Sequence, residues 1–174
     1  PVAQSKKSYD DVIAKIADNT DVVFVTFQVA AKSQQVADGL SKAGKKAVVF
    51  GSDGSFSPDF KTPGAYVSAF APDVTGIPAA ASVTEAYTAA YGKFGTYGPP
   101  AYVATQAILQ AAQRACKASG ASADRAGVLA ELPNTNIAGS ILGRDIKFDS
   151  KGDVEDAKFY IFKLDDSGAP VMAQ

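Results

Sequence analysis

Residues 48–56 of the chain, VVFGSDGSF, carry an apolar run directly into a Gly-Ser-Asp-Gly sequence. The run is typical of a strand buried in a sheet, and the glycines allow the backbone after it to approach a neighbouring group closely. The carboxylate of Asp53 therefore lies just past the end of a predicted strand. From this stretch alone a turn is favoured, because Asp often bonds its own backbone two residues on. Binding of a cationic group is the alternative.

The segments before this stretch predict a parallel sheet. A helix with a capping residue at Ser8 leads to residues 22–27, VVFVTF, an apolar run that suits a strand covered on both faces. Residues 30–43 have helical apolar spacing and end at Gly44, and residues 47–50 form the next predicted strand. The order strand, helix, strand favours parallel pairing through a right-handed crossover.

Ligands of open parallel sheets bind beyond the carboxyl ends of the strands. Two short segments follow the predicted strand ends, namely Phe27, Gln28 and Val29 after the first strand and Ser52, Asp53 and Gly54 after the second. We therefore expect these segments to be neighbours. A carboxylate placed there, with apolar walls, would hold an ammonium group and an aliphatic body.

The chain beyond residue 56 predicts a third strand at residues 65–70 and then a change of pattern. Residues 71–79, APDVTGIPA, contain two prolines and a glycine and predict a connection between two parts of the chain. Helices are expected at about residues 82–94 and 100–118. Four of their side chains are expected to pack in a core, namely Tyr87, Tyr91, Ile108 and Leu109.

The end of the chain predicts β-structure. Residues 145–149 and 158–164 flank Ser150-Lys151-Gly152-Asp153, a predicted hairpin loop, and a short final strand is expected near Val171. The loop has some likeness to a calcium-binding loop. It lacks the downstream glutamate that such a loop needs, so a hairpin turn is favoured.

The composition excludes several classes of function. Seventeen basic and eighteen acidic residues give a net charge of -1, which provides no electrostatic drive toward nucleic acid or a membrane surface. The chain has no histidine, which removes the usual general base and the commonest zinc ligand. Its one cysteine, Cys116, cannot form a disulfide within the chain. We predict no catalytic residue, no metal site and no cofactor.

The order of several longer segments adds to this interpretation. GAYVSAFAP at residues 64–72 is followed by EAYTAAYGKFGTYGPPAYV at 85–103, and GRDIKFDSKGDVEDAKFYIFKL closes the series at 143–164. The set resembles the C-terminal part of the periplasmic solute-binding proteins of the branched-chain amino acid type, which serve ABC importers.

The resemblance implies an α/β fold, the type I periplasmic-binding-protein fold, in which two lobes trap the ligand between them. This chain would contribute to both lobes. Residues 1–70 would belong to one lobe, 71–79 to a crossing, 80–163 to the second lobe, and 164–174 to the return crossing and terminal strand. A complete member is considerably longer, and the part that this chain lacks is N-terminal.

The resemblance also implies roles for single residues. Asp53 matches the acidic residue that binds the α-ammonium group of an amino acid, and Tyr102 matches a position that lines the side-chain pocket. Gln28 or Val29 falls where an aromatic residue often contacts the ligand, so this chain departs from that pattern. Phe27, Ser52 and Gly54 complete the expected ligand-binding set.

The resemblance further implies a location and partners. The parent protein would be periplasmic or otherwise extracytoplasmic and would deliver its ligand to the membrane subunits of an ABC importer. The first strand would lack neighbours, so we predict a homodimer or a companion fragment. The alternatives are a ligand-sensing receptor module and a truncated chain that no longer binds ligand. An enzyme with Asp53 as its general base is disfavoured, because such catalysis depends on positioned partners.

Overall fold

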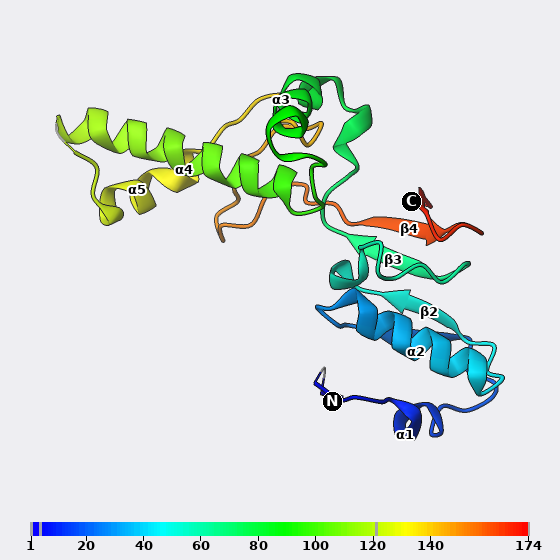
Figure 1. Cartoon of the computed structure of the whole chain (residues 1–174). Coiled ribbons are helices and arrows are strands. Elements are labelled where there is room, and N and C mark those ends of the chain that lie inside the picture. The colour runs from blue at the N-terminus through cyan, green and yellow to red at the C-terminus, as the bar shows by residue number, and fades with distance from the viewer. Residues whose placement is uncertain (1, 4, 121, 174) are drawn as a thin grey trace. The chain divides into compact units, whose positions relative to one another are not determined.

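The computed structural model describes residues 2–3, 5–120 and 122–173, and the chain divides into two compact units (Figure 1). Unit 1 consists of Pro1–Phe70 and Phe159–Gln174. Unit 2 consists of Ala71–Lys158. The second unit is thus an insertion between two strands of the first.

Unit 1 is built on a five-stranded sheet with the order β1-β2-β3-β4-β5. The strands are β1 (Val22–Val25), β2 (Val48–Gly51), β3 (Tyr66–Ala69), β4 (Tyr160–Leu164) and β5 (Pro170–Met172). The first three strands are parallel, whereas β4 pairs antiparallel to β3 and β5 antiparallel to β4. The α/β fold class with a mostly parallel sheet is confirmed.

One face of this sheet carries the core of unit 1. Helix α2 (Ala30–Lys42) connects β1 to β2 and packs its apolar stripe, which includes Val36 and Leu40, against this face (Figure 1). The connection from β2 to β3 places Phe60 in the same core, where it is 1% exposed. The short helix α1 (Asp10–Ile13) contributes Ile13 to it as well. A right-handed crossover fixes the side on which a helix lies, so both connections cover one face.

The opposite face of the sheet is uncovered in the described part of the chain. Val22 is 53% exposed, Phe24 59% and Val48 37%, although all three lie in strands. The expectation that residues 22–27 form a strand buried on both faces is therefore wrong for this chain. The apolar run gave no sign of this, because a strand with two apolar faces has the same sequence whether or not the second face is occupied.

Unit 2 is mainly helical. Its helices are α3 (Ala81–Tyr91), α4 (Gly98–Ser119) and α5 (Arg125–Glu131), with the short 3₁₀ turns η2 (Val74–Gly76), η3 (Pro78–Ala80) and η4 (Leu132–Asn134). Its core joins Val103 and Ala107 of α4 to Ile137, Ile141 and Ile146 of the following loop. Two isolated bridges, Ile137 to Ile146 and Phe148 to Val154, order that loop.

Three expectations for the second half of the chain are wrong. Ile108 and Leu109 are 52% and 58% exposed, and Tyr91 is 78% exposed rather than part of a core. Residues 158–164 do not pair with residues 145–149, since β4 within that segment pairs with β3. The turn after Asp149 does form, and its carboxylate Oδ1 accepts hydrogen bonds from the backbone N–H groups of Lys151 and Asp153 at 2.8 and 3.0 Å.

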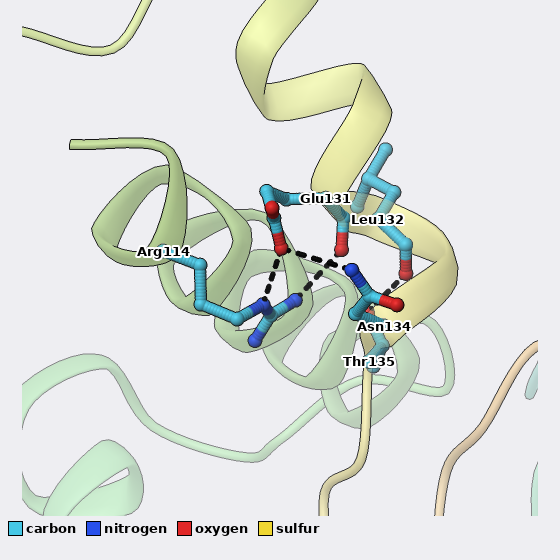
Figure 2. Close-up of polar contacts among 5 residues, drawn as sticks. All are labelled: Arg114, Glu131, Leu132, Asn134 and Thr135. Atoms are coloured by element: carbon cyan, nitrogen blue, oxygen red, sulfur yellow. Dashed lines mark hydrogen bonds and ion pairs between the residues drawn. The ribbon is translucent and has the colours of Figure 1, made fainter. Parts of the chain in front are cut away.

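A polar cluster ties α4 to α5 (Figure 2). Arg114 donates through Nε to the Glu131 carboxylate at 3.1 Å and through a terminal nitrogen to the Glu131 carbonyl oxygen at 2.8 Å. Asn134 donates to the same carboxylate oxygen at 3.0 Å. The hydrogen bond from Asn134 and then the attraction of Arg114 lower the pKa of Glu131 below its ordinary value, against the opposing effect of desolvation.

Replacing Arg114 by Met is expected to lower the midpoint of thermal unfolding at pH 7, because two hydrogen bonds between α4 and α5 are lost. A carboxylate whose pKa is lowered by folding stabilises the protein above its ordinary pKa, and this contribution is lost as the pH falls through the lowered value. The difference between Arg114→Met and the wild type should therefore shrink below about pH 4.5, the usual range of Glu. Thermal unfolding followed by circular dichroism between pH 7 and pH 3 measures this, and a difference that is constant with pH would contradict it.

Candidate functional site

The carboxyl edge of the parallel strands brings two predicted segments together. Val25 and Gly51 are partners in the register of β1 and β2, so the residues that follow each strand emerge side by side. The Ser52 N–H donates to the Val25 carbonyl at 2.9 Å, and the Ser52 hydroxyl lies 3.5 Å from the Phe27 carbonyl oxygen. Five of the predicted site residues, Phe27, Gln28, Ser52, Asp53 and Gly54, thus lie within one small region of unit 1.

Asp53 begins a tight turn rather than a flexible loop. Residues Asp53–Ser55 form the 3₁₀ turn η1, in which the Ser55 N–H donates to the Ser52 carbonyl at 2.8 Å and the Phe56 N–H to the Asp53 carbonyl at 3.0 Å. Asp53 itself is half-buried, whereas Gly54 and Ser55, which follow it in the turn, are buried. The carboxylate is therefore held at the edge by backbone that packs beneath it.

A buried pair of hydroxyl groups anchors this turn to α2. The Oγ atoms of Ser33 and Ser55 lie 2.7 Å apart, and both residues are fully buried. A buried hydroxyl without a partner costs free energy, so each serine requires the other. The sequence interpretation missed this pair. The available signal was Ser33 itself, a polar residue within the apolar stripe that also contains Ala30, Val36 and Ala37.

Replacing either serine of this pair by alanine should lower the free energy of unfolding by about 1–3 kcal/mol, because the remaining hydroxyl is left buried and unpaired. The double variant Ser33→Ala/Ser55→Ala should cost less than the sum of the two single variants. Urea unfolding of the four proteins measures both effects. Ser41→Ala, at an exposed position of the same helix, is the control. Strictly additive single effects would show that the two hydroxyls do not act as a pair.

Close packing requires glycine both at the end of β2 and within the turn. A Cβ on Gly54 would lie 2.7 Å from Gln28 Cα and closer still to the Phe27 carbonyl oxygen, and both of these are backbone atoms. A Cβ on Gly51 would lie 2.5 Å from the Ser55 Cβ. The two segments at the edge are therefore in direct backbone contact, which only glycine at position 54 permits.

Gly54→Ala should lower the free energy of unfolding by about 1–3 kcal/mol, the usual cost of overpacking against groups that cannot move aside. Gly95→Ala is the matched control, since a Cβ there meets nothing within 4 Å and its backbone is not in the left-handed region. Urea unfolding followed by circular dichroism compares them. Equal stability of the two variants would show that the segments are not packed as described.

The side chains of the predicted site residues outside the turn have different surroundings. The centroid of the Phe27 ring lies 5.2 Å from that of Tyr9, which is buried. The group of Phe27 that contacts Ser52 at the edge is therefore its backbone carbonyl and not its side chain. Gln28 and Val29 are exposed, and Val29 is also the residue before the first turn of α2. Tyr102 lies in unit 2, on α4, and is 37% exposed.

Two hollows are found elsewhere on the described surface. One of about 530 Å³ is lined by residues of η2 and α3, including Thr84 and Glu85, and one of about 520 Å³ lies between α4 and α5, near Ile108 and Leu129. None of the predicted site residues lines either hollow. Across residues 2–3, 5–120 and 122–173, no group of three or more acidic or cysteine side chains is placed to hold a metal ion. No helix in those ranges is long and apolar enough to cross a membrane.

Comparison with known proteins finds similarity in structure alone. No family model and no curated protein sequence matches the chain. Among solved structures, a leucine-binding protein from Thermotoga maritima superposes with a TM-score of 0.83 at 17% identity, covering 99% of this chain and 49% of that protein. A fatty acid ABC transporter substrate-binding protein from Thermomonospora curvata gives 0.79 at 21% identity, covering 100% and 48%.

A third solved structure, again of a binding protein, is similar over the same share of its length. The leucine-, isoleucine-, valine-, threonine- and alanine-binding protein from Brucella ovis gives a TM-score of 0.72 at 19% identity, covering 100% of this chain and 48% of that protein. All three neighbours are named as binding proteins for small molecules. The chain spans about half the length of the solved structures that it matches, and over that length it has the fold of the periplasmic binding proteins of ABC importers.

Proposed function

We propose that the chain takes part in capturing an amino acid or a similar small zwitterion, as a solute-binding protein or a piece of one. The observation that carries the proposal is the placement of Asp53 at the carboxyl edge of β1 and β2, on a turn held by buried hydrogen bonds and close backbone packing. Open parallel sheets bind ligands at this edge. A carboxylate on such a fixed turn suits an ammonium group, because the backbone that carries it needs no reorganisation on binding.

The comparisons support the class of function that we propose, namely the binding of a small solute. Two of the three structural neighbours described above carry names of amino acids that they bind, and all three are substrate-binding proteins. The partners that follow are the membrane subunits of an ABC importer, in a periplasmic or extracytoplasmic setting. The proposal includes a homodimer or a companion fragment. The role of Tyr102 in lining the pocket for the ligand's side chain depends on the family resemblance alone.

A second ligand class has support from one observation. The neighbour from Thermomonospora curvata, at 21% identity, is named for fatty acid transport. A fatty acid has a carboxylate but no ammonium group, so it would gain nothing from Asp53. The dependence of binding on the charge of Asp53 therefore separates the two ligand classes.

Asp53→Asn should weaken the binding of an amino acid by at least about 30-fold, because breaking an ammonium–carboxylate pair in a site shielded from water costs of order 2–5 kcal/mol. Isothermal titration calorimetry with a panel of amino acids and one medium-chain fatty acid measures this. The control is Asp59→Asn, which removes the same charge from an exposed position a few residues away.

Amino-acid affinity that is equal in Asp53→Asn and the wild type would refute the ammonium-binding role. Tight binding of the fatty acid, unchanged by Asp53→Asn, would favour the second ligand class. If no compound of the panel binds a chain that circular dichroism shows to be folded, the chain by itself does not bind ligand, and capture belongs to a more complete protein.

A further inference from the structure

The hydroxyl pair of Ser33 and Ser55 is a polar contact in a core that is otherwise built from aliphatic and aromatic side chains. Both residues are 0% exposed, and their Oγ atoms lie 2.7 Å apart. Alanine at both positions would be the simpler solution for such a core, because replacing both partners of a buried hydrogen bond by apolar groups is nearly neutral for stability. Stability alone therefore does not account for the hydroxyl pair.

The last residue of β2 makes room for this pair. A Cβ on Gly51 would lie 2.5 Å from the Ser55 Cβ and 2.7 Å from the Ser55 Oγ. Glycine weakens a strand, because it has no side chain to pack and loses more conformational freedom on folding. Strand β2 thus ends in an unfavourable residue at the point where the Ser55 side chain needs the space.

The hydroxyl pair joins the two segments that form the candidate site. Ser55 lies two residues after Asp53 in the same 3₁₀ turn, η1. Ser33 lies one turn of helix after Val29, the residue that precedes the first turn of α2. The hydrogen bond therefore connects the segment after β1 to the segment after β2. Such a bond fixes a distance and a direction, whereas an apolar contact is non-directional.

The other contacts of the turn do not replace this bond. Gly54 touches the backbone of Phe27 and Gln28, which stops the turn from moving inward but does not resist movement outward. The hydrogen bond from the Ser52 N–H to the Val25 carbonyl holds the chain before the turn. The hydroxyl pair holds the chain at the last residue of the turn, and its strength falls steeply when the geometry changes.

We propose that Ser33 and Ser55 are positioning residues for ligand binding, whose hydrogen bond sets the place of the Asp53 carboxylate against the start of α2. Buried polar groups that are fully paired make a core rigid and specify one arrangement. Both serines are fully buried, so they act through Asp53 without touching the ligand. The inference rests on the proposed function and deepens it, since it names the residues that prepare Asp53 for an ammonium group.

Calorimetric titration of the double variant Ser33→Ala/Ser55→Ala tests the proposal. The probes are leucine, isoleucine, valine, threonine and alanine, the amino acids in the names of two structural neighbours. Every amino acid that the wild type binds should bind the double variant at least about threefold more weakly, because a less ordered carboxylate must be fixed on binding. The midpoint of urea unfolding should stay close to that of the wild type.

Two comparisons separate positioning from a general loosening of the fold. Val36→Ala is the control, because it removes buried volume from the same face of α2 and lowers stability without changing the hydroxyl pair. Its affinity for the same amino acids should equal that of the wild type. In an Asp53→Asn background, the two serine changes should cause no further loss of affinity, since positioning acts through the carboxylate that is absent.

Four results would overturn the proposal. They are a double variant with wild-type affinity, a double variant that circular dichroism shows to be unfolded, an equal loss of affinity in Val36→Ala, and a loss that persists in full in the Asp53→Asn background. An unfolded double variant counts against the proposal because the hydroxyl pair would then serve the fold itself.

Failure of this inference is distinguishable from failure of the proposed function. A folded wild type that binds none of the five amino acids, or binds them equally well with Asp53→Asn, refutes the ammonium-binding role and this inference with it. A wild type whose binding requires Asp53, together with a double serine variant of unchanged affinity, retains the proposed function and refutes the positioning role alone.

Discussion

The handedness of the crossover between β1 and β2 is the constraint on which the arrangement of unit 1 depends. The parallel strands follow one another in a single direction across the sheet, so each right-handed connection returns on the same side. Helix α2 and the segment that contains Phe60 therefore share one face and build the core there. The same rule leaves the other face with no connection to cover it, and Phe24 and Val22 remain in water.

The candidate site follows from the same geometry. Parallel strands end at one edge, and this is why residues 27–28 and 52–54 meet there although they are far apart in the sequence. The edge is rigid because its backbone segments touch at Gly54 and because Ser55 is tied to Ser33 of α2. A site for a small charged ligand benefits from such rigidity, since little conformational freedom is lost on binding.

The sequence predicted the parts of the fold that are decided locally. Apolar runs bounded by turn residues located β1, β2 and β3, and helical spacing located α2 and α4, because these signals depend on a few neighbouring residues. The adjacency of Gln28 and Gly54 also followed, from the rule that parallel strands share a carboxyl edge. For Asp53, the pattern left a turn and a ligand site open, and the structure shows the turn, with Asp53 half-buried in it.

The errors concern contacts between distant segments. Whether Ile108, Leu109 and the outer side of β1 are buried depends on what packs against them, and apolar spacing carries no information about that. The expected hairpin at the end of the chain failed for a related reason. The segment 158–164 has strong β character, but its partner is β3, nearly a hundred residues earlier, and not its neighbour in sequence. The buried pair of Ser33 and Ser55 likewise becomes visible only when α2 is placed on the turn.

The uncovered face of the sheet and the candidate site belong to the same short strands, and this links their energetics. Residues 22–25 and 48–51 carry the exposed apolar side chains, and the residues directly after them form the edge where Asp53 lies. A partner that covers Phe24 stabilises the native strands and not the unfolded chain, so it also stabilises the edge that those strands position. If binding at the edge strengthens association at the face, association must strengthen binding by the same factor. If this chain both binds a ligand at the edge and has a partner on the uncovered face, the two equilibria are linked through β1 and β2, the elements that both would share.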